Sequence, residues 1–120
     1  MGIKLVIVDD APFIREVMRN IFLTTDIEVV GEAEDGEEAV SVVLELNPDV
    51  VIMDIVMPKK SGIDATQEIL QGNPDIKIIA CSTADQEHMM LKALEAGCCS
   101  FLVKPFKAKD LEQAVRLAVN

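Results

Sequence analysis

Apolar residues along the chain fall into two alternating patterns, one typical of buried strands and one typical of helices. Apolar runs with strand character cover residues 3–8, 27–33, 49–53, 76–81 and 99–103. Apolar residues at helical spacing follow each run, in the segments 14–22, 35–46, 63–71, 86–96 and 107–119. Glycine or proline stands at many of the joins. The pattern therefore predicts five strands and five helices in strict alternation.

Strict alternation of strands and helices is typical of a doubly wound α/β domain, in which a parallel sheet carries helices on both faces. Residues 50–53 are all apolar, so we expect this strand to lie in the centre of the sheet. In such a sheet, binding sites form beyond the carboxyl ends of the strands, where the strand order reverses. The residues that follow the strands are therefore the candidates for function.

Polar residues follow four of the five predicted strands. Asp9 and Asp10 come after the first strand, Asp54 after the third, Ser82 after the fourth and Lys104 after the fifth. Any one of them has an ordinary explanation, because acids after a strand often cap a helix and lysines are common in solvated turns. An ordinary explanation is not enough for Asp54, because burying an unpaired carboxylate costs several kcal/mol. Matching chemistry at four strand ends favours a functional site.

The chemistry of these side chains points to phosphoryl transfer. Three carboxylates at close quarters cannot all be ionised without a cation, and oxygen-only ligands favour Mg²⁺. A lysine and a serine can each bind an oxygen of a phosphoryl group. With a metal balancing the charge, one carboxylate can act as a nucleophile. We therefore expect Asp54 to be held in place for phosphorylation.

Composition excludes several other classes of function. The length of 120 residues predicts one domain, spanning 1–120. A net charge of −10 with only 11 lysines and arginines argues against binding to nucleic acid or to an anionic membrane. The start of the chain lacks a signal peptide, and no apolar run reaches the roughly 18 residues of a membrane span. The three cysteines Cys81, Cys98 and Cys99 lie in or beside apolar runs, so we expect buried free thiols in a reducing cytoplasm.

Four stretches carry a resemblance to a known family: "VIVDD", "DVVIMDIVMPKKSG", "CSTAD" and "AGCCSFLVKPF". Together, and in this order, they resemble the response-regulator receiver domain, especially its CheY-like, single-domain members. The resemblance covers essentially the whole chain and implies a flavodoxin-like fold with sheet order 2-1-3-4-5. It implies a cytoplasmic signalling protein of a two-component phosphorelay, with chemotaxis as one candidate pathway. A histidine kinase or a histidine phosphotransfer protein would supply the phosphoryl group.

The resemblance also implies roles for the acidic residues. Asp54 corresponds to the phosphoacceptor. Asp10 would ligate Mg²⁺ directly, Asp9 would do so mainly through water, and the backbone carbonyl of Val56 would complete the metal site. The domain would catalyse only its own phosphorylation and dephosphorylation. Val56 and Ala84 stand where the family places side chains beside the hydrolytic water, and neither side chain can orient it, so we expect slow self-dephosphorylation.

Switching would involve the ends of the fourth and fifth strands. Ser82 would bind the phosphoryl group and shift towards it, and Lys104 would pair with a phosphoryl oxygen next to a cis bond to Pro105. Phe101 occupies the aromatic switch position and lacks the hydroxyl of a tyrosine. Thr83 replaces the small residue usual in the family, which predicts a narrower entrance to the phosphoryl site.

Two surfaces are candidates for partner binding. The first helix begins beside the acids, and Phe13, Ile14 and Val17 are the expected docking residues for the phosphodonor, with Lys59 and Lys60 as charges at the rim. Ile14 and Val17 would alternatively belong to the core stripe of that helix. In this family the fourth helix, fifth strand and fifth helix bind a downstream partner or a second copy. Met90, Leu94 and Phe101 map to that surface, with Leu117 beside it, and the alternative places Met90 and Leu94 in the core.

Three other functions compete with this one. Haloacid dehalogenase-type phosphatases use D-x-D, but position 56 is valine, so the proton shuttle is missing. A flavin module of the same fold needs a phosphate-binding loop after the first strand, where "DDAP" would repel phosphate in the absence of a metal. The third is the receiver fragment of a longer regulator, such as a transcription factor.

Overall fold

Five parallel strands form a single sheet in the order β2-β1-β3-β4-β5, as the resemblance predicts. The computed structural model describes residues 2–120. The strands are β1 (Ile3–Val8), β2 (Ile27–Ala33), β3 (Val50–Asp54), β4 (Lys77–Thr83) and β5 (Ser100–Lys104). The helices are α1 (Pro12–Phe22), α2 (Gly36–Leu46), α3 (Gly62–Gly72), α4 (Met90–Ala96) and α5 (Ala108–Ala118), with a 3₁₀ helix, η1 (Ala84–Met89), before α4.

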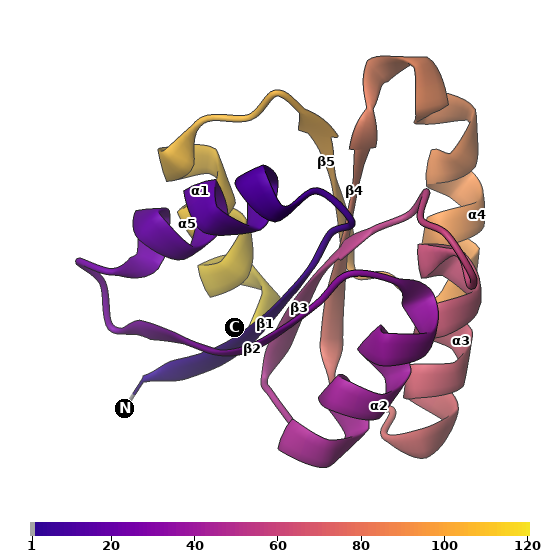
Figure 1. Ribbon diagram of the computed structural model, residues 1–120, viewed down its shortest axis with the longest axis horizontal. Coiled ribbons are helices and arrows are strands. Elements are labelled where there is room, and N and C mark those ends of the chain that lie inside the picture. Colours follow the sequence, from indigo (N-terminus) through magenta and orange to yellow (C-terminus); the bar gives the residue numbers. More distant parts are fainter. Residues whose placement is uncertain (1) are drawn as a thin grey trace.

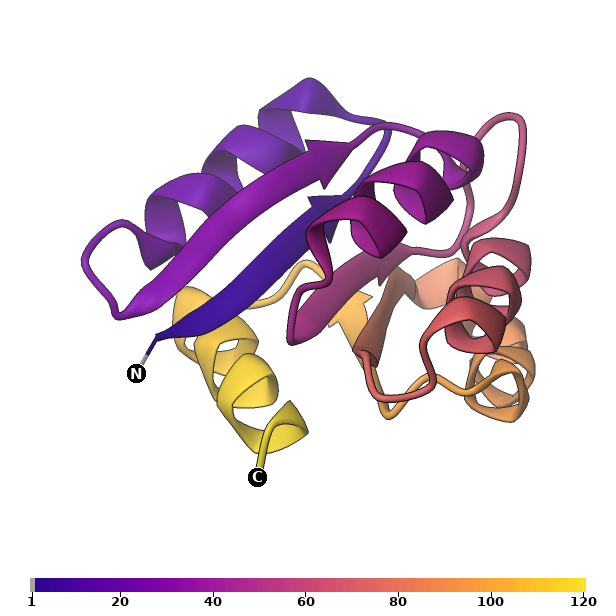
Figure 2. The same ribbon diagram turned by 90° about the horizontal axis from the view of Figure 1, so that it is seen from below.

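The helices cover both faces of the sheet and create two cores. Helices α1 and α5 lie on one face, and α2, α3 and α4 lie on the other (Figures 1 and 2). Side chains of the central strands alternate between the two cores: Ile52 packs with the α1 and α5 side, and Val51 with the α2, α3 and α4 side. Every residue of β3 is buried, as expected for a strand covered on both faces.

Local signals explain where several helices begin and end. Pro12 stands in the first turn of α1, where its missing N–H costs nothing. The side chain of Asp35 caps α2 by accepting from the backbone N–H of Glu38, and Ser61 caps α3 in the same way. Helix α4 ends at Gly97, whose φ of 118° is a left-handed conformation that glycine adopts readily.

The segment between β4 and β5 differs from the prediction of one helix over 86–96. Residues 84–89 form the 3₁₀ helix η1, and α4 begins only at Met90. A capping box marks where this segment begins: the backbone N–H of Thr83 donates to Gln86 while the Thr83 side chain accepts in return. The hydroxyl of Thr83 also donates to the carboxylate of Asp85. Short 3₁₀ segments are frequent at the start of α-helices.

The prediction of three buried thiols is correct for Cys81 and Cys98 and wrong for Cys99. All three are free. The N–H of Cys98 closes the end of α4 by donating to the carbonyl of Ala93, and the N–H of Cys99 donates to Ile78 of β4. Consecutive side chains entering a strand point to opposite sides, so burying Cys98 turns Cys99 outward at the sheet edge.

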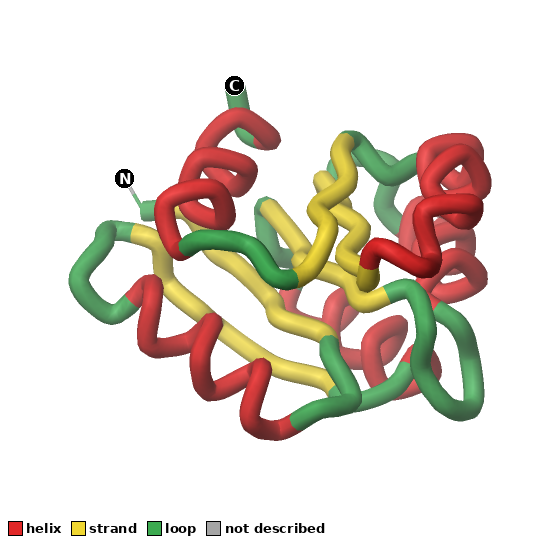
Figure 3. The backbone as a smooth tube through the Cα atoms, turned by 90° about the horizontal axis from the view of Figure 1, so that it is seen from above, coloured by secondary structure: helices red, strands yellow, loops and turns green. Residues whose placement is uncertain are grey.

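The strand order reverses between β1 and β3, and this brings the predicted site together. The two strands pair in parallel with Val8 opposite Met53. The next residue of each strand, Asp9 and Asp54, therefore emerges at the same point of the sheet edge. Figure 3 looks onto this edge, from which the chain passes through loops to the following helices. This is the position at which doubly wound sheets bind ligands.

Candidate functional site

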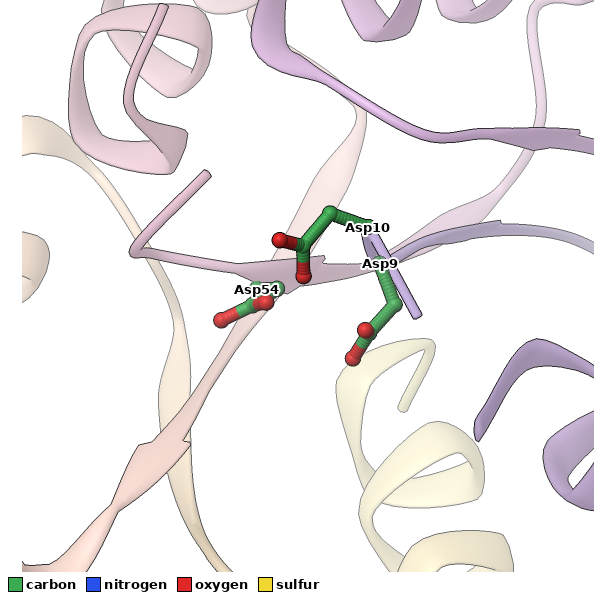
Figure 4. Close-up of side chains that lie close together, drawn as sticks. All are labelled: Asp9, Asp10 and Asp54. Atoms are coloured by element: carbon green, nitrogen blue, oxygen red, sulfur yellow. The ribbon is translucent and has the colours of Figure 1, made fainter. Parts of the chain in front are cut away.

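Three acidic side chains converge beyond the ends of β1 and β3. Asp9 and Asp54 are buried, with exposed fractions of 1% and 6%, while Asp10 is exposed. One carboxylate oxygen from each lies within 4.8 Å of the others. Figure 4 shows that Asp9 and Asp10 leave the chain in different directions and that Asp10 approaches Asp54. The structure thus brings together the three acids that the sequence predicts.

Asp9 is firmly anchored at all three of its oxygens. Its Oδ1 accepts a hydrogen bond of 2.9 Å from the backbone N–H of Ala11, and its Oδ2 accepts one of 2.8 Å from Lys104 Nζ. Its backbone carbonyl accepts from Arg15 Nη1 at 2.6 Å. Asp10, in contrast, faces solvent beside Asp54. The open coordination positions of the site are therefore those of Asp10 and Asp54.

The environment of Asp54 disfavours its charged form. Burial, together with the negative charges of Asp9 and Asp10, raises the pKa of Asp54 to about 6, against the opposing pull of Lys104 and of the Val56 N–H. Lys104 Nζ lies 3.8 Å from Asp54 Oδ2, and the Val56 N–H lies 3.3 Å from Oδ1. The site therefore contains more negative charge than its own residues neutralise.

The same negative charges favour the charged form of Lys104. Burial alone would lower its pKa, but the hydrogen bond that it donates to Asp9 and the negative charges of Asp54 and Asp9 outweigh this and raise the pKa. Lys104 is therefore a stable cation, and among residues 2–120 it is the only one whose side chain contacts the carboxylates of Asp9 and Asp54. The peptide bond from Lys104 to Pro105 is cis, as the resemblance predicts.

Two glycines allow neighbouring helices to press against the loop after β3. A Cβ on Gly62, the first residue of α3, would lie 2.1 Å from the carbonyl oxygen of Asp54. A Cβ on Gly36, the first residue of α2, would lie 2.0 Å from the carbonyl oxygen of Lys60. Real Cβ atoms do not approach backbone this closely, so only glycine fits. Both helices thereby fix the loop that follows Asp54.

Ser82 and Phe101 lie where the sequence predicts, but neither contacts the acids. Ser82 is buried, and its hydroxyl donates to the carbonyl of Thr83 at 3.3 Å. Phe101 is half-buried against the α2, α3 and α4 core. The Thr83 side chain is engaged in the capping box of η1 and is exposed. The Thr83 hydroxyl is therefore engaged in hydrogen bonds at the start of η1. That Thr83 narrows the entrance to the phosphoryl site stays a prediction.

On α1, the structure separates the predicted docking residues into two groups. Phe13 is 72% exposed and Val17 is also exposed, whereas Ile14 packs against the α1 and α5 core. The two predicted rim lysines both form ion pairs. Lys59 Nζ lies 3.6 Å from Asp35 Oδ2, and Lys60 Nζ lies 2.5 Å from Glu68 Oε2. Both lysines are therefore tied to neighbouring helices.

On α4, Leu94 is exposed and Met90 is half-buried. Leu91 is more exposed than either, at 67%, and sequence reasoning missed it. Leu91 and Leu94 lie three residues apart on α4, and this spacing places both on its outward face. Arg15 was also missed, because nothing in its spacing shows that it reaches a backbone carbonyl.

The acidic cluster fits a hard divalent cation. All of its side-chain donors are carboxylate oxygens, which suit Mg²⁺ better than softer metals. Three carboxylates face a single lysine, Lys104, and burial further disfavours the charged form of Asp54. A cation bound by Asp10 and Asp54 would supply the missing positive charge.

Comparison with known proteins identifies the family. The response regulator receiver domain model matches residues 5–116. The chemotaxis protein CheY of Thermotoga maritima is 45% identical over 115 residues, 96% of each chain. The solved response regulator domain of Thermotoga maritima CheB has a TM-score of 0.92 at 36% identity, covering 100% of this chain and 98% of that one. A solved CheX–CheY–BeF3–Mg complex from Borrelia burgdorferi has a TM-score of 0.88 at 31% identity, covering 96% of this chain and 87% of that one.

The chain belongs to the response regulator receiver family. It is a CheY-like, phosphoryl-accepting domain of two-component signalling, and a signalling protein rather than an enzyme. This membership sets aside the phosphatase and the flavin module. Within residues 2–120, every helix is too short or too polar to cross a membrane.

The raised pKa of Asp54 predicts a stability effect that depends on pH. As the pH falls, Asp54 of the metal-free folded protein takes up a proton near its pKa of about 6, whereas in the unfolded chain it does so only near 3.8. The cost of its charge is therefore complete above the folded pKa and absent below the unfolded one. Asp54→Asn should raise the free energy of unfolding by about 1 to 3 kcal/mol at neutral pH. This gain should disappear on acidification.

Urea unfolding in the presence of a chelator, repeated across this pH range, measures the effect. Asp75→Asn removes an exposed acid far from the cluster and serves as the matched control. A constant gain for Asp54→Asn at every pH would show that charge burial is not its cause.

Proposed function

We propose that Asp54 accepts a phosphoryl group, assisted by Mg²⁺ held by Asp9, Asp10, Asp54 and the backbone carbonyl of Val56. One observation carries the proposal: a buried carboxylate lies beside two other acids, with a lysine 3.8 Å away. When bound, the metal supplies positive charge that offsets repulsion between the carboxylates and the incoming phosphoryl oxygens. Asp10 and Asp54 would bind it directly, and the anchored Asp9 mainly through water.

The chain's own residues account for the transfer. An oxygen of ionised Asp54 attacks phosphorus, and the bond to the donor's nitrogen or oxygen breaks with its electron pair leaving on the donor. The Asp54 oxygen nearer the Val56 N–H is already engaged, which leaves the other facing Lys104. Lys104 would then pair with a phosphoryl oxygen, and Ser82 would turn from the Thr83 carbonyl to donate to another.

We predict that the protein incubated with Mg²⁺ and a small acyl phosphate gains one phosphoryl group, and that Asp54→Asn gains none. Intact-mass spectrometry is the appropriate measurement, because the chain has no Trp or Tyr for fluorescence. Asp64→Asn, an exposed acid in the first turn of α3, is the control and should be labelled normally. Equal labelling of Asp54→Asn would show that another residue is the nucleophile.

Phosphorylation would be transmitted through Ser82 and Phe101. A phosphoryl group adds a charge of about −1.5 to −2, enough to bias an element that has two arrangements. Movement of Ser82 towards it would vacate space into which Phe101 turns. The surface of α4, β5 and α5 would read this change through Leu94, Met90 and the neighbouring Leu91, binding a downstream protein or a second copy. Their clustering on a short helix supports this surface.

Exposed Phe13 and Val17 support a docking site for the phosphodonor at the start of α1, beside the acids. Ile14, which packs inward, would support the helix rather than touch the partner. The donor would be a histidine kinase or a histidine phosphotransfer protein, as befits a receiver domain. A partner that delivers a phosphoryl group to Asp54 must cover this end of α1.

We predict that Phe13→Ala slows transfer from a phosphorylated histidine kinase while labelling by acyl phosphate is unchanged. Leu23→Ala is the matched control, because Leu23 is equally exposed, at 74%, at the opposite end of α1. It should affect neither reaction. The comparison is made from phosphoryl-transfer time courses, and equal slowing of both reactions by Phe13→Ala would contradict docking.

The lifetime of the phosphorylated state would depend on Val56 and Ala84. Both are exposed, Val56 at 45%, and neither offers a polar side chain to orient a water molecule. Val56→Asn combined with Ala84→Glu should speed dephosphorylation by about ten- to a hundredfold, the usual effect of an orienting contact. Phosphoryl half-life in excess Mg²⁺ after donor removal is the measurement. An unchanged half-life would mean that another group orients the water.

We also propose a cytoplasmic role in chemotaxis. The Thermotoga maritima relative is a chemotaxis protein, and the Borrelia burgdorferi CheY was solved in complex with CheX. Two buried free cysteines fit a reducing compartment. The net charge of −10 supports protein partners rather than nucleic acid or an anionic membrane.

A further inference from the structure

Arg15 links the acidic site to strand β2. Its side chain is only 16% exposed although it lies on α1. Its Nη1 donates to the backbone carbonyl of Asp9 at 2.6 Å, and its Nε donates to Glu32 Oε1 at 3.1 Å. Glu32 lies on β2, and its other oxygen accepts from Arg19 at 2.6 Å. One guanidinium therefore connects a site residue, α1 and β2.

The bond to Asp9 has a geometric consequence for Asp10. The carbonyl of Asp9 belongs to the peptide unit that joins Asp9 to Asp10, and a peptide unit is planar. Fixing its oxygen fixes the plane, and with it the position of the Asp10 Cα. The N–H of Asp9 already donates to Ala33 of β2 at 3.1 Å. Both backbone groups of Asp9 are thus held with reference to β2.

Asp10 is exposed and lies two residues beyond Val8, the last β1 residue paired with β2 and β3. The peptide on its other side is held within the same loop, by the Ala11 N–H that donates to Asp9 Oδ1, so Arg15 is the link that ties the position of Asp10 to β2. A carboxylate that ligates a metal must keep its position to bind tightly, and groups behind the ligands commonly provide this. Arg15 holds the peptide that carries Asp10, so it is suited to this task.

We propose that Arg15, held by Glu32, is a positioning residue that presents Asp10 to the divalent cation. The inference rests on the proposed metal site. The planar guanidinium serves two acceptors at once, which the single ammonium of a lysine cannot do with the same geometry. The positioning of Asp10 therefore depends on the shape of the Arg15 side chain as well as on its charge. Through Glu32, it also depends on β2.

Calorimetric titration with Mg²⁺ alone tests the proposal on the unphosphorylated protein. Arg15→Gln should weaken binding by about tenfold, the lower range for loss of a group behind a metal ligand. Arg15→Lys should also bind Mg²⁺ more weakly than the unaltered protein. Glu32→Gln should weaken binding less, and it should cause no further loss in the Arg15→Gln background, because the two residues act as a unit.

Arg19→Gln is the matched control, since Arg19 contacts Glu32 without reaching Asp9. It should bind Mg²⁺ within about twofold of the unaltered protein, because it leaves both bonds of Arg15 in place. Thermal unfolding with a chelator reports folding separately: a purely structural Arg15 would lower the unfolding temperature and leave the affinity of the folded protein unchanged. If Arg15→Gln does not fold, Glu32→Gln and Arg15→Lys carry the test.

The outcomes separate this inference from the metal site itself. Unchanged affinity in Arg15→Gln, or full affinity in Arg15→Lys, would overturn the positioning role while leaving the site intact. Absence of Mg²⁺ binding by the unaltered protein would overturn the proposed metal site and this inference with it. Loss in Arg15→Gln and Arg15→Lys but not in Arg19→Gln would establish the positioning role.

Discussion

Mutual repulsion among the carboxylates of Asp9, Asp10 and Asp54 is the constraint on which the site depends. Left to themselves, three acids this close would separate or take up protons. Lys104 compensates part of the charge through its bond to Asp9 and its approach to Asp54, but one lysine faces three carboxylates, and burial disfavours the charged form of Asp54 further. The fold therefore holds a region of unrelieved negative charge at its edge. That charge is what makes the edge selective for a cation.

Rigid surroundings keep this charge in place. The reversal of strand order puts the ends of β1 and β3 next to each other, and a fully buried β3 cannot move without disturbing both cores. The contacts of Gly62 and Gly36 close the loop after Asp54 from two sides. Such a site favours a ligand that fits the existing positions, because little ordering remains to be done on binding.

The sequence predicted the architecture well because its signals were local and strong. The alternation of apolar runs and helical patterns and the acids after β1 and β3 all express physics within a few residues. The sheet order needed the family resemblance, because periodicity does not say which parallel strands are neighbours.

What the sequence did not show depends on contacts between distant segments. Arg15 reads as an ordinary helix-surface charge until Glu32 and the Asp9 carbonyl are seen beside it. Leu91 was missed because the side of α4 that faces solvent is set by how the helix packs, and Cys99 because its exposure follows from its place at the sheet edge. Packing partners, rather than residue types, decided each of these positions.

The six-residue 3₁₀ helix η1 gives the region after β4 a different energetic character from the rest of the domain. Its hydrogen bonds are geometrically poorer than those of an α-helix, none of its residues is buried, and α4 behind it has only seven residues. Opening this segment sacrifices little apolar contact, so its backbone amides should exchange with solvent faster than those of β3. This segment is therefore the part of the sheet edge that can rearrange at the least cost to the two cores.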